Sequence, residues 1–314
     1  MGHEKVKSFH AGQRVSAMGL KESFPYRAGR YALRLPSRLY SKYITEPIVK
    51  NWLKKSELVV YVHDPKRGLL RPVLEGQRLK WTLNENLSVD ATYWLDVVEP
   101  LLTRDDIVFD VGTNIGTIAN WLANRTHHVH GFEPHPDNLQ LTNEQIQIRK
   151  TKNITLSQLA LGSEPGTLQL HVKSFHGHHS LGDTSGSPTV EKIDVKVETV
   201  DRYCTSNGIE RIDFLKIDVE GFEEDVLKGA TGMLKNDKVG LVLFELRLSI
   251  LESIGKNGKD IFAPLLEQGY TVFTLDGRVL TSEELENPAD ADYLAAVNPE
   301  AYIPHLGTST APVI

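Results

Sequence analysis

The sequence predicts an α/β fold in which helices cover both faces of a parallel sheet. From residue 107 onward, segments with the pattern of buried strands alternate with segments that have the pattern of helices. The first of these strands runs into the glycine-containing turn DVGTNIG (110–116), which is typical of a strand-to-helix connection. The chain has 314 residues, 40% of them hydrophobic, which is enough for one large domain and a smaller one.

Residues 1–84 are expected to form a small N-terminal α+β extension. Within it, ELVVYV (57–62) and RLKWTL (78–83) have the composition of short strands, and DPKRG between them is typical of a turn. Residues 27–55 carry eight basic residues and three tyrosines against a single acid, Glu46. We interpret this basic segment either as a solvated face or as a surface for an anionic or carrier-linked substrate.

Residues 85–314 are expected to form the main domain. A helix over 89–102, which Pro100 should end early, leads into the sheet. Strands are then expected at 107–111, 128–133 and 154–161, with helices near 115–124 and 137–149 between them. Because a βαβαβ order requires right-handed crossovers, these strands should be parallel.

An insertion at about 166–200 interrupts the alternation. Strands at 167–172 and 193–200 flank a loop rich in Gly, Ser and His, whose length predicts a lid or a binding loop. The alternation then resumes, with strands at 212–218, 239–246, 270–275 and 293–298 and with helices from about 222 and over 260–268.

Composition narrows the classes of partner. The net charge of −6 and the pI near 6.1 provide no general attraction to nucleic acid. The single cysteine, Cys204, cannot form an internal disulfide, which favours a reducing compartment. No apolar segment has the pattern of a signal peptide or approaches the ~20 residues of a membrane helix. We therefore expect a cytoplasmic protein without stable membrane insertion.

The turn after the first strand indicates which ligand binds there. It lacks the lysine and the length of a P-loop, and Asn114 stands where a dinucleotide fingerprint needs glycine. Asp110 beside the turn would repel a pyrophosphate but would attract a cationic ligand such as S-adenosylmethionine. Gly112 lets the backbone approach that ligand, and Glu133, at the end of the second strand, can accept hydrogen bonds from ribose hydroxyls. Alternatively, the glycines only meet the steric needs of the turn.

The segment KIDVEG (216–221) brings ionisable residues to the carboxyl end of the fourth strand, where open α/β sheets bind ligands. Asp218 is the first candidate for a general base and Glu220 the second. A non-catalytic role is an equal alternative for Asp218: it orders the cofactor or caps the next helix, and Lys216 neutralises its charge. Glu220 and Glu223 could likewise only stabilise the dipole of that helix. Glu245, at the end of the fifth strand, either meets substrate or terminates the strand.

Three histidines, His176, His178 and His179, lie in the long loop. They could supply a general base, for which His179 is the candidate, or they are solvated loop residues. No carboxylate with metal-ligand spacing stands beside them. A divalent ion on Asp218 and Glu220 would be chemically compatible with their oxygen ligands, but no metal is predicted.

Several strings of the sequence resemble the FkbM family of S-adenosylmethionine-dependent methyltransferases. They are FDVGTNIG, FEPHPDN, LALGSEPGTLQL, SL at 180–181, VETVDRYC and IDFLKIDVEGFEEDVLKGA, within about residues 85–300. The resemblance implies a class I methyltransferase (Rossmann-like) fold with a seven-stranded, mostly parallel sheet. It also implies a role for Ser180 in contacting substrate or cofactor. Thr113 stands where family members commonly have alanine, a departure that should not disturb the cofactor. The residues expected to bind the cofactor are Asp110, Gly112, Thr113, Asn114, Gly116, Glu133, Pro134, Gln158, Ala160 and Asp218.

The resemblance implies O-methylation of a hydroxyl on a saccharide or natural product. Two alternatives are a protein that binds the cofactor without turnover and an enzyme that N-methylates a small molecule. Methylation of nucleic acid is not expected, because the chain is acidic and lacks a motif that would stack a flipped base. The acceptor and the oligomeric state are not predicted.

Overall fold

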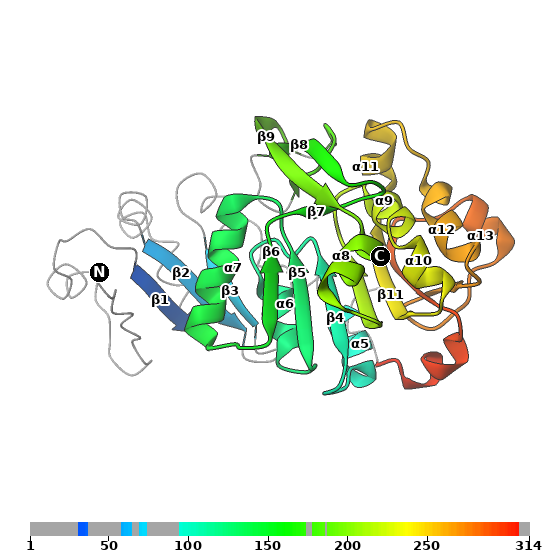
Figure 1. Cartoon of the computed structure of the whole chain (residues 1–314), viewed down its shortest axis with the longest axis horizontal. Coiled ribbons are helices and arrows are strands. Elements are labelled where there is room, and N and C mark those ends of the chain that lie inside the picture. Colours follow the sequence, from blue (N-terminus) through cyan, green and yellow to red (C-terminus); the bar gives the residue numbers. More distant parts are fainter. Residues whose placement is uncertain are drawn as a thin grey trace, which may run out of the picture. The chain divides into compact units, whose positions relative to one another are not determined.

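The computed structural model describes residues 31–36, 58–64, 69–73, 94–173, 178–185 and 187–307. The chain divides into two compact units, residues 1–88 and 89–314, which we treat separately (Figure 1). In the first unit, β2 pairs in parallel with β1 and antiparallel with β3. Their bounds are β1 (Tyr31–Pro36), β2 (Leu58–Asp64) and β3 (Leu69–Val73).

The strand expected at 57–62 is confirmed by β2, whereas the strand expected at 78–83 lies outside the described residues. Most of the basic segment 27–55 lies outside them too, so its two interpretations stay predictions. The division into domains at 1–84 and 85–314, with a lid at about 166–200, likewise stays a prediction.

A seven-stranded sheet forms the centre of the second unit, counted over the described residues, in the order β12-β13-β11-β10-β4-β5-β6. All neighbouring strands are parallel except β13, which runs antiparallel to both β11 and β12. Its strands are β4 (Ile107–Val111), β5 (His128–Phe132), β6 (Ile154–Ser157), β10 (Ile212–Ile217), β11 (Val239–Leu246), β12 (Thr271–Thr274) and β13 (Ala291–Ala296). The expected fold class is confirmed.

Helices follow most of these strands in the chain (Figure 1). The α-helices are α5 (Trp94–Val98), α6 (Thr117–Ala123), α7 (Pro136–Arg149), α8 (Val200–Asn207), α9 (Glu223–Lys228), α10 (Thr231–Lys235), α11 (Leu248–Ser253), α12 (Ala263–Leu266) and α13 (Ser282–Glu286). The 3₁₀ turns are η2 (Glu99–Leu101), η4 (Gly258–Phe262), η5 (Pro299–Ala301) and η6 (Ile303–His305). As expected, the α-helix before the sheet ends before Pro100. Across the described ranges, no helix combines the length and apolar character needed to cross a membrane.

Apolar residues cover both faces of the sheet. On one face, Phe109 of β4 packs edge-on against Tyr203 of α8, with ring centroids 5.7 Å apart. On the other, Phe214 of β10 lies 6.5 Å from Trp94 of α5, measured between ring centroids. Because successive side chains of a strand point to opposite faces, a strand buried on both sides needs a continuous apolar run. In β4 the run IVF (107–109) supplies it, and in β10 the adjacent residues Phe214 and Leu215 do.

A second, three-stranded sheet has the order β7-β9-β8, formed by β7 (Ala160–Leu161), β8 (Gly166–Lys173) and β9 (Thr189–Glu198). The strand expected over 154–161 is therefore two strands: β6 pairs with β5 in the main sheet, whereas β7 pairs with β9. The strand is interrupted because β6 ends at Ser157, and Gln158 and Leu159 belong to neither sheet. This small sheet carries the residues of the predicted lid.

Candidate active site

The turn between β4 and α6 is held tightly against neighbouring strands. The N–H groups of Gly112 and Thr113 both donate to the carbonyl oxygen of Phe132, at 3.1 and 3.0 Å. Gly112 has φ +81°, and a Cβ added to it would lie 1.8 Å from the carbonyl oxygen of Asp218. Asn114 also has a left-handed backbone, with φ +51°. The glycine is thus required for the close approach of β4 and the end of β10.

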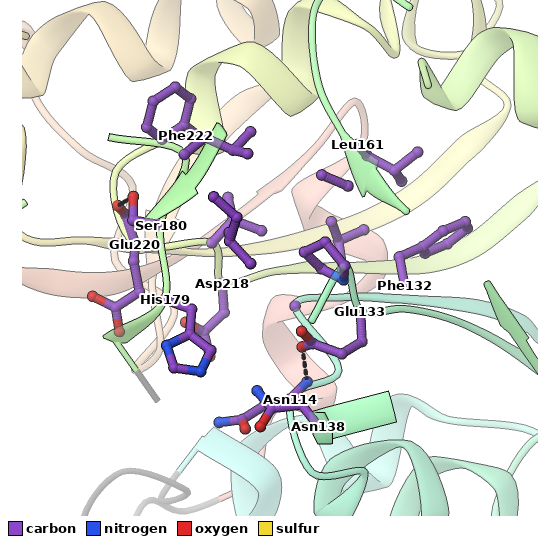
Figure 2. A pocket seen from close by; sticks show the side chains of 17 residues that line it. Asn114, Phe132, Glu133, Asn138, Leu161, His179, Ser180, Asp218, Glu220 and Phe222 are labelled. Carbon is purple, nitrogen blue, oxygen red and sulfur yellow. Dashed lines mark hydrogen bonds between the residues drawn. The ribbon is translucent and has the colours of Figure 1, made fainter. Parts of the chain in front are cut away.

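A pocket opens at the carboxyl ends of β4, β5 and β10, and the second sheet closes one side of it. In Figure 2, Glu133, Asp218, Asn114 and His179 surround its interior. Phe132, Leu161 and Leu170 give it apolar walls. Its complete lining is Val111, Gly112, Asn114, Phe132, Glu133, Pro134, Asn138, Ala160, Leu161, Leu170, His179, Ser180, Leu181, Asp218, Val219, Glu220 and Phe222.

Glu133 directly follows β5 and is 5% exposed. Its two carboxylate oxygens accept the backbone N–H of Asn114 and of His135, each at 2.8 Å (Figure 2 shows the first of these bonds). Burial nevertheless raises the pKa of Glu133 to about 8, although these two hydrogen bonds oppose that rise. The carboxylate keeps further lone pairs that can accept hydroxyl donors from a ligand.

Lys216 of β10 connects the ends of two neighbouring strands, β4 and β10. Its Nζ lies 3.2 Å from Asp110 Oδ1 and 3.2 Å from Asp218 Oδ2, and it donates to the carbonyl oxygen of Gly112 at 3.2 Å. Burial alone would lower the pKa of Lys216, but the carboxylates of Asp218 and Asp110 outweigh burial and raise it. Asp110 is fully buried and does not line the pocket. Its contact is therefore with Lys216, not with the pocket interior.

Three carboxylates meet at the outer part of the site. One oxygen each of Asp218, Glu220 and Glu245 lies within 4.8 Å of the others. Arg247 contacts Glu245 at 2.6 Å and opposes the like-charge repulsion. Burial, followed by the negative charges of Asp218 and Glu223, raises the pKa of Glu220 to about 8. The pKa of Glu245 is raised as well, by burial and by Asp218.

The loop histidines occupy different surroundings. His179 lines the pocket, and its ring centroid lies 4.6 Å from that of His135. Its Nδ1 accepts the backbone N–H of Lys173 at 3.1 Å, so a neutral His179 carries its proton on Nε2. This tautomer makes Nε2 a donor rather than a base. His178 contacts Ser187 instead, with 3.2 Å between Nδ1 and Oγ, and His176 lies outside the described residues.

The sequence-predicted cofactor residues separate into two groups. One group lines the pocket: Gly112, Asn114, Glu133, Pro134, Ala160 and Asp218. The other does not: Asp110, Thr113, Gly116 and Gln158. Thr113 is buried and donates to the carbonyl oxygen of Asp110, and a Cβ on Gly116 would meet Thr142 at 2.4 Å, so these two serve the turn and its packing.

Sequence reasoning missed several lining residues. Asn138 is the last residue of FEPHPDN, so its motif was recognised but its side chain was not singled out. Leu170 and Phe222 have the pattern of ordinary strand and turn residues, because the first reaches the pocket through the packing of β8 and the second through the turn between β10 and α9. No local signal identifies them.

A seven-stranded sheet with one reversed strand and a pocket at the carboxyl ends of its first, second and fourth parallel strands define a class I methyltransferase fold. The family described as the methyltransferase FkbM domain matches residues 110–272, which is more than half of the chain. The chain belongs to this family.

Two curated relatives are similar over about 150 residues. The hexuronic acid methyltransferase AglP of Haloferax volcanii is 31% identical over 49% of this chain and 63% of its own length. The 2-O-methyltransferase NoeI of Sinorhizobium fredii is 24% identical over 42% of this chain and 60% of its own length. The chain thus spans less than two thirds of either relative.

Among solved structures, methyltransferase FkbM from Methylobacillus flagellatus is similar with a TM-score of 0.40 and 16% identity. The match covers 82% of this chain and 60% of that one.

Proposed function

We propose that this protein transfers the methyl group of S-adenosylmethionine to a hydroxyl of a saccharide or related natural product. The observation that carries the proposal is the pocket itself. A buried carboxylate, Glu133, lines it beside apolar walls, and two more carboxylates, those of Asp218 and Glu220, line it as well. Membership of the FkbM family supports methyl transfer. The name of AglP, a hexuronic acid methyltransferase, supports a sugar-derived acceptor, and that of NoeI, a 2-O-methyltransferase, supports transfer to oxygen.

The lining fits such a cofactor in its donor and acceptor chemistry. Glu133 can accept both hydroxyls of a ribose, and Phe132, Leu161 and Leu170 offer apolar surface to an adenine ring. Asp218 and the backbone around Gly112 and Asn114 would hold the amino-acid part. Bound there, S-adenosylmethionine supplies a methyl group activated by its positive sulfur.

The protein's part in the reaction is to align the acceptor oxygen and to accept its proton. Between the two candidate bases, we favour Glu220 over Asp218, which reverses the order suggested by the sequence. A base works best when its pKa lies near the working pH, and the pKa of Glu220 is raised to about 8. Asp218, by contrast, forms an ion pair with Lys216 at 3.2 Å. His179 would donate a hydrogen bond from its Nε2 to a ligand in the pocket rather than act as a base.

The proposal is tested in two measurements. Calorimetry with S-adenosylmethionine should show binding that Glu133→Ala weakens. Mass spectrometry should then detect a deuterated methyl group on one member of a panel of hexuronic acids and neutral glycosides. Glu220→Gln should bind the cofactor normally but transfer about 10²-fold more slowly. Absence of cofactor binding would refute the proposal, and binding without any transfer would favour a binding protein.

An anionic or carrier-linked form of the acceptor, and a cytoplasmic location, belong to this proposal as predictions from the sequence.

A further inference from the structure

The turn from β10 into α9 has an unusual backbone at the residue that we propose as the base. Glu220 has φ +55°, a left-handed conformation that costs free energy for any residue other than glycine. Gly221 follows with φ +100°. Such strained residues persist where their surroundings hold them, and they cluster at functional sites. Two buried side chains, described next, hold the backbone of Glu220 in this conformation.

The first is Glu223, which is 3% exposed. Its carboxylate turns back toward the preceding turn. Oε1 accepts the N–H of Val219 at 3.0 Å and that of Gly221 at 3.2 Å, while Oε2 accepts Gly221 N–H at 3.1 Å. The carboxylate thereby binds the backbone immediately before and after Glu220.

The second is Ser180, which is 1% exposed and comes from the residues between β8 and β9. Its hydroxyl donates to the carbonyl oxygen of Glu220 at 2.7 Å, and Figure 2 shows the two residues together. Its own backbone is tied to β8, because the N–H of His171 donates to the carbonyl oxygen of Ser180 at 2.8 Å. The contact thus joins the second sheet to the turn that carries Glu220.

We propose that Glu223 and Ser180 are positioning residues that hold the Glu220 carboxylate at the acceptor end of the pocket. Glu223 binds the two N–H groups that flank Glu220, and Ser180 binds its carbonyl oxygen. This assigns Ser180 to the backbone of the turn rather than to direct contact with cofactor or substrate. The inference rests on the proposed function, because it takes Glu220 as the base.

The test compares variants that differ in one hydrogen bond. Ser180→Ala removes the donor to Glu220, whereas the control Ser185→Ala removes a hydroxyl of the same segment between β8 and β9 that donates to the carbonyl oxygen of Ser249 at 3.1 Å. Glu223→Ala removes the acceptors, and Glu223→Gln keeps one oxygen that can accept both N–H groups. Glu224→Gln, on the same helix, is the second control, since Glu224 forms an ion pair with Lys228.

We expect Ser180→Ala and Glu223→Ala to lower kcat at least about tenfold, a part of what a general base contributes. The acceptor KM, the cofactor Kd and the thermal midpoint should change little for Ser180→Ala. Glu223→Gln should recover most of the loss, and both controls should match the wild type. An unchanged kcat, or a fall in kcat matched by an equal loss of cofactor affinity, would overturn the proposal.

Amide hydrogen exchange gives a readout that does not depend on activity. The amides of Val219 and Gly221 should exchange faster in Glu223→Ala than in the wild type, and Glu224→Gln should leave them unchanged. A wild type that binds no cofactor and transfers no methyl group would refute the proposed function. An active wild type with normal turnover in Ser180→Ala would refute the positioning role alone. If Glu223→Ala does not fold, Ser180→Ala still decides the question.

Discussion

At the end of β4, the 1.8 Å approach of a Gly112 Cβ to the carbonyl oxygen of Asp218 changes the role that the sequence suggests for this glycine. A side chain there would meet the protein before it met a ligand. We expect Gly112→Ala to lower the free energy of unfolding by about 3 kcal/mol, from the clash and from φ +81°. Urea denaturation measures the change.

Gly166→Ala is the matched control, because no atom lies within 4 Å of its added Cβ. It should stay within about 0.5 kcal/mol of the wild type. A Gly112→Ala protein as stable as the wild type, with only its cofactor binding lost, would instead restore the simpler view of a ligand-facing glycine.

Glu133 allows a second prediction, because its pKa of about 8 lies well above that of an ordinary glutamate. Ribose hydroxyls donate best to the ionised carboxylate, so binding below that pKa should release a proton. We expect cofactor affinity to rise between pH 6.5 and 8.5. Calorimetry in buffers of different ionisation enthalpy measures the released proton.

Glu133→Gln cannot titrate, so its binding should be weaker and should lack this proton release. The same release in the variant and the wild type would show that another group is responsible.

The buried amine of Lys173, the last residue of β8, holds part of the segment between β8 and β9. The Nζ of Lys173 donates to Asp183 Oδ1 at 2.9 Å and to the carbonyl oxygen of Thr184 at 2.7 Å. We expect Lys173→Met to keep the fold but to speed amide exchange over residues 178–185 about tenfold, because both acceptors lose the buried amine, although Asp183 keeps a hydrogen bond from Thr189. Exchange followed by mass spectrometry measures this. Lys192→Met, on the exposed side of β9, should have no such effect, and equal exchange in both variants would contradict the anchor.

Helices and strands could be predicted where a local sequence pattern specifies them, but not where tertiary packing stabilises them. The continuous apolar runs of β4 and β11 identify these strands at 107–111 and 239–246, as predicted, because burial on both faces leaves a local signal. The short helices α8, α11 and α13 were not predicted, because five to eight residues gain their stability from packing. For α13 a local signal existed, since Thr281 and Glu284 form a capping box.

In the site, too, local sequence patterns predict some residues, whereas others depend on which strands are neighbours. Glu133 and Asp218 could be placed at strand ends from the sequence, and the structure brings both to one pocket. The contact of Asp110 with Lys216 could not be derived, because it requires β4 to lie beside β10 with these two residues in register. A single sequence does not specify that neighbourhood. From the sequence, Asp110 was therefore expected to contact the ligand, whereas in the structure it forms an ion pair with Lys216.

For the whole molecule, the buried acids make stability depend on pH. The pKa values of Glu133 and Glu220 are about 8 and that of Glu223 is about 7. A glutamate in the unfolded chain has a pKa of about 4.3. Between these values the folded protein holds protons that the unfolded chain has released, so stability falls as pH rises toward 8. Burial lowers the pKa of His130 to about 4, which acts in the opposite direction only below about pH 6.5.

We therefore expect a smaller free energy of unfolding at pH 8.5 than at pH 6.5 for the ligand-free protein, measured by urea denaturation. Glu133→Gln should reduce that difference, because it removes one of the acids that hold a proton in the folded protein. A difference of the same size in variant and wild type would assign the effect to other groups.

The reversed strand β13 sets the time at which this sheet can be completed during synthesis. It lies between β11 and β12, although both are made before it. Until residues 291–296 leave the ribosome, β12 cannot join the sheet, and β11 exposes a row of unpaired backbone N–H and C=O groups to other nascent chains. Premature termination before codon 291 would thus yield an aggregation-prone polypeptide.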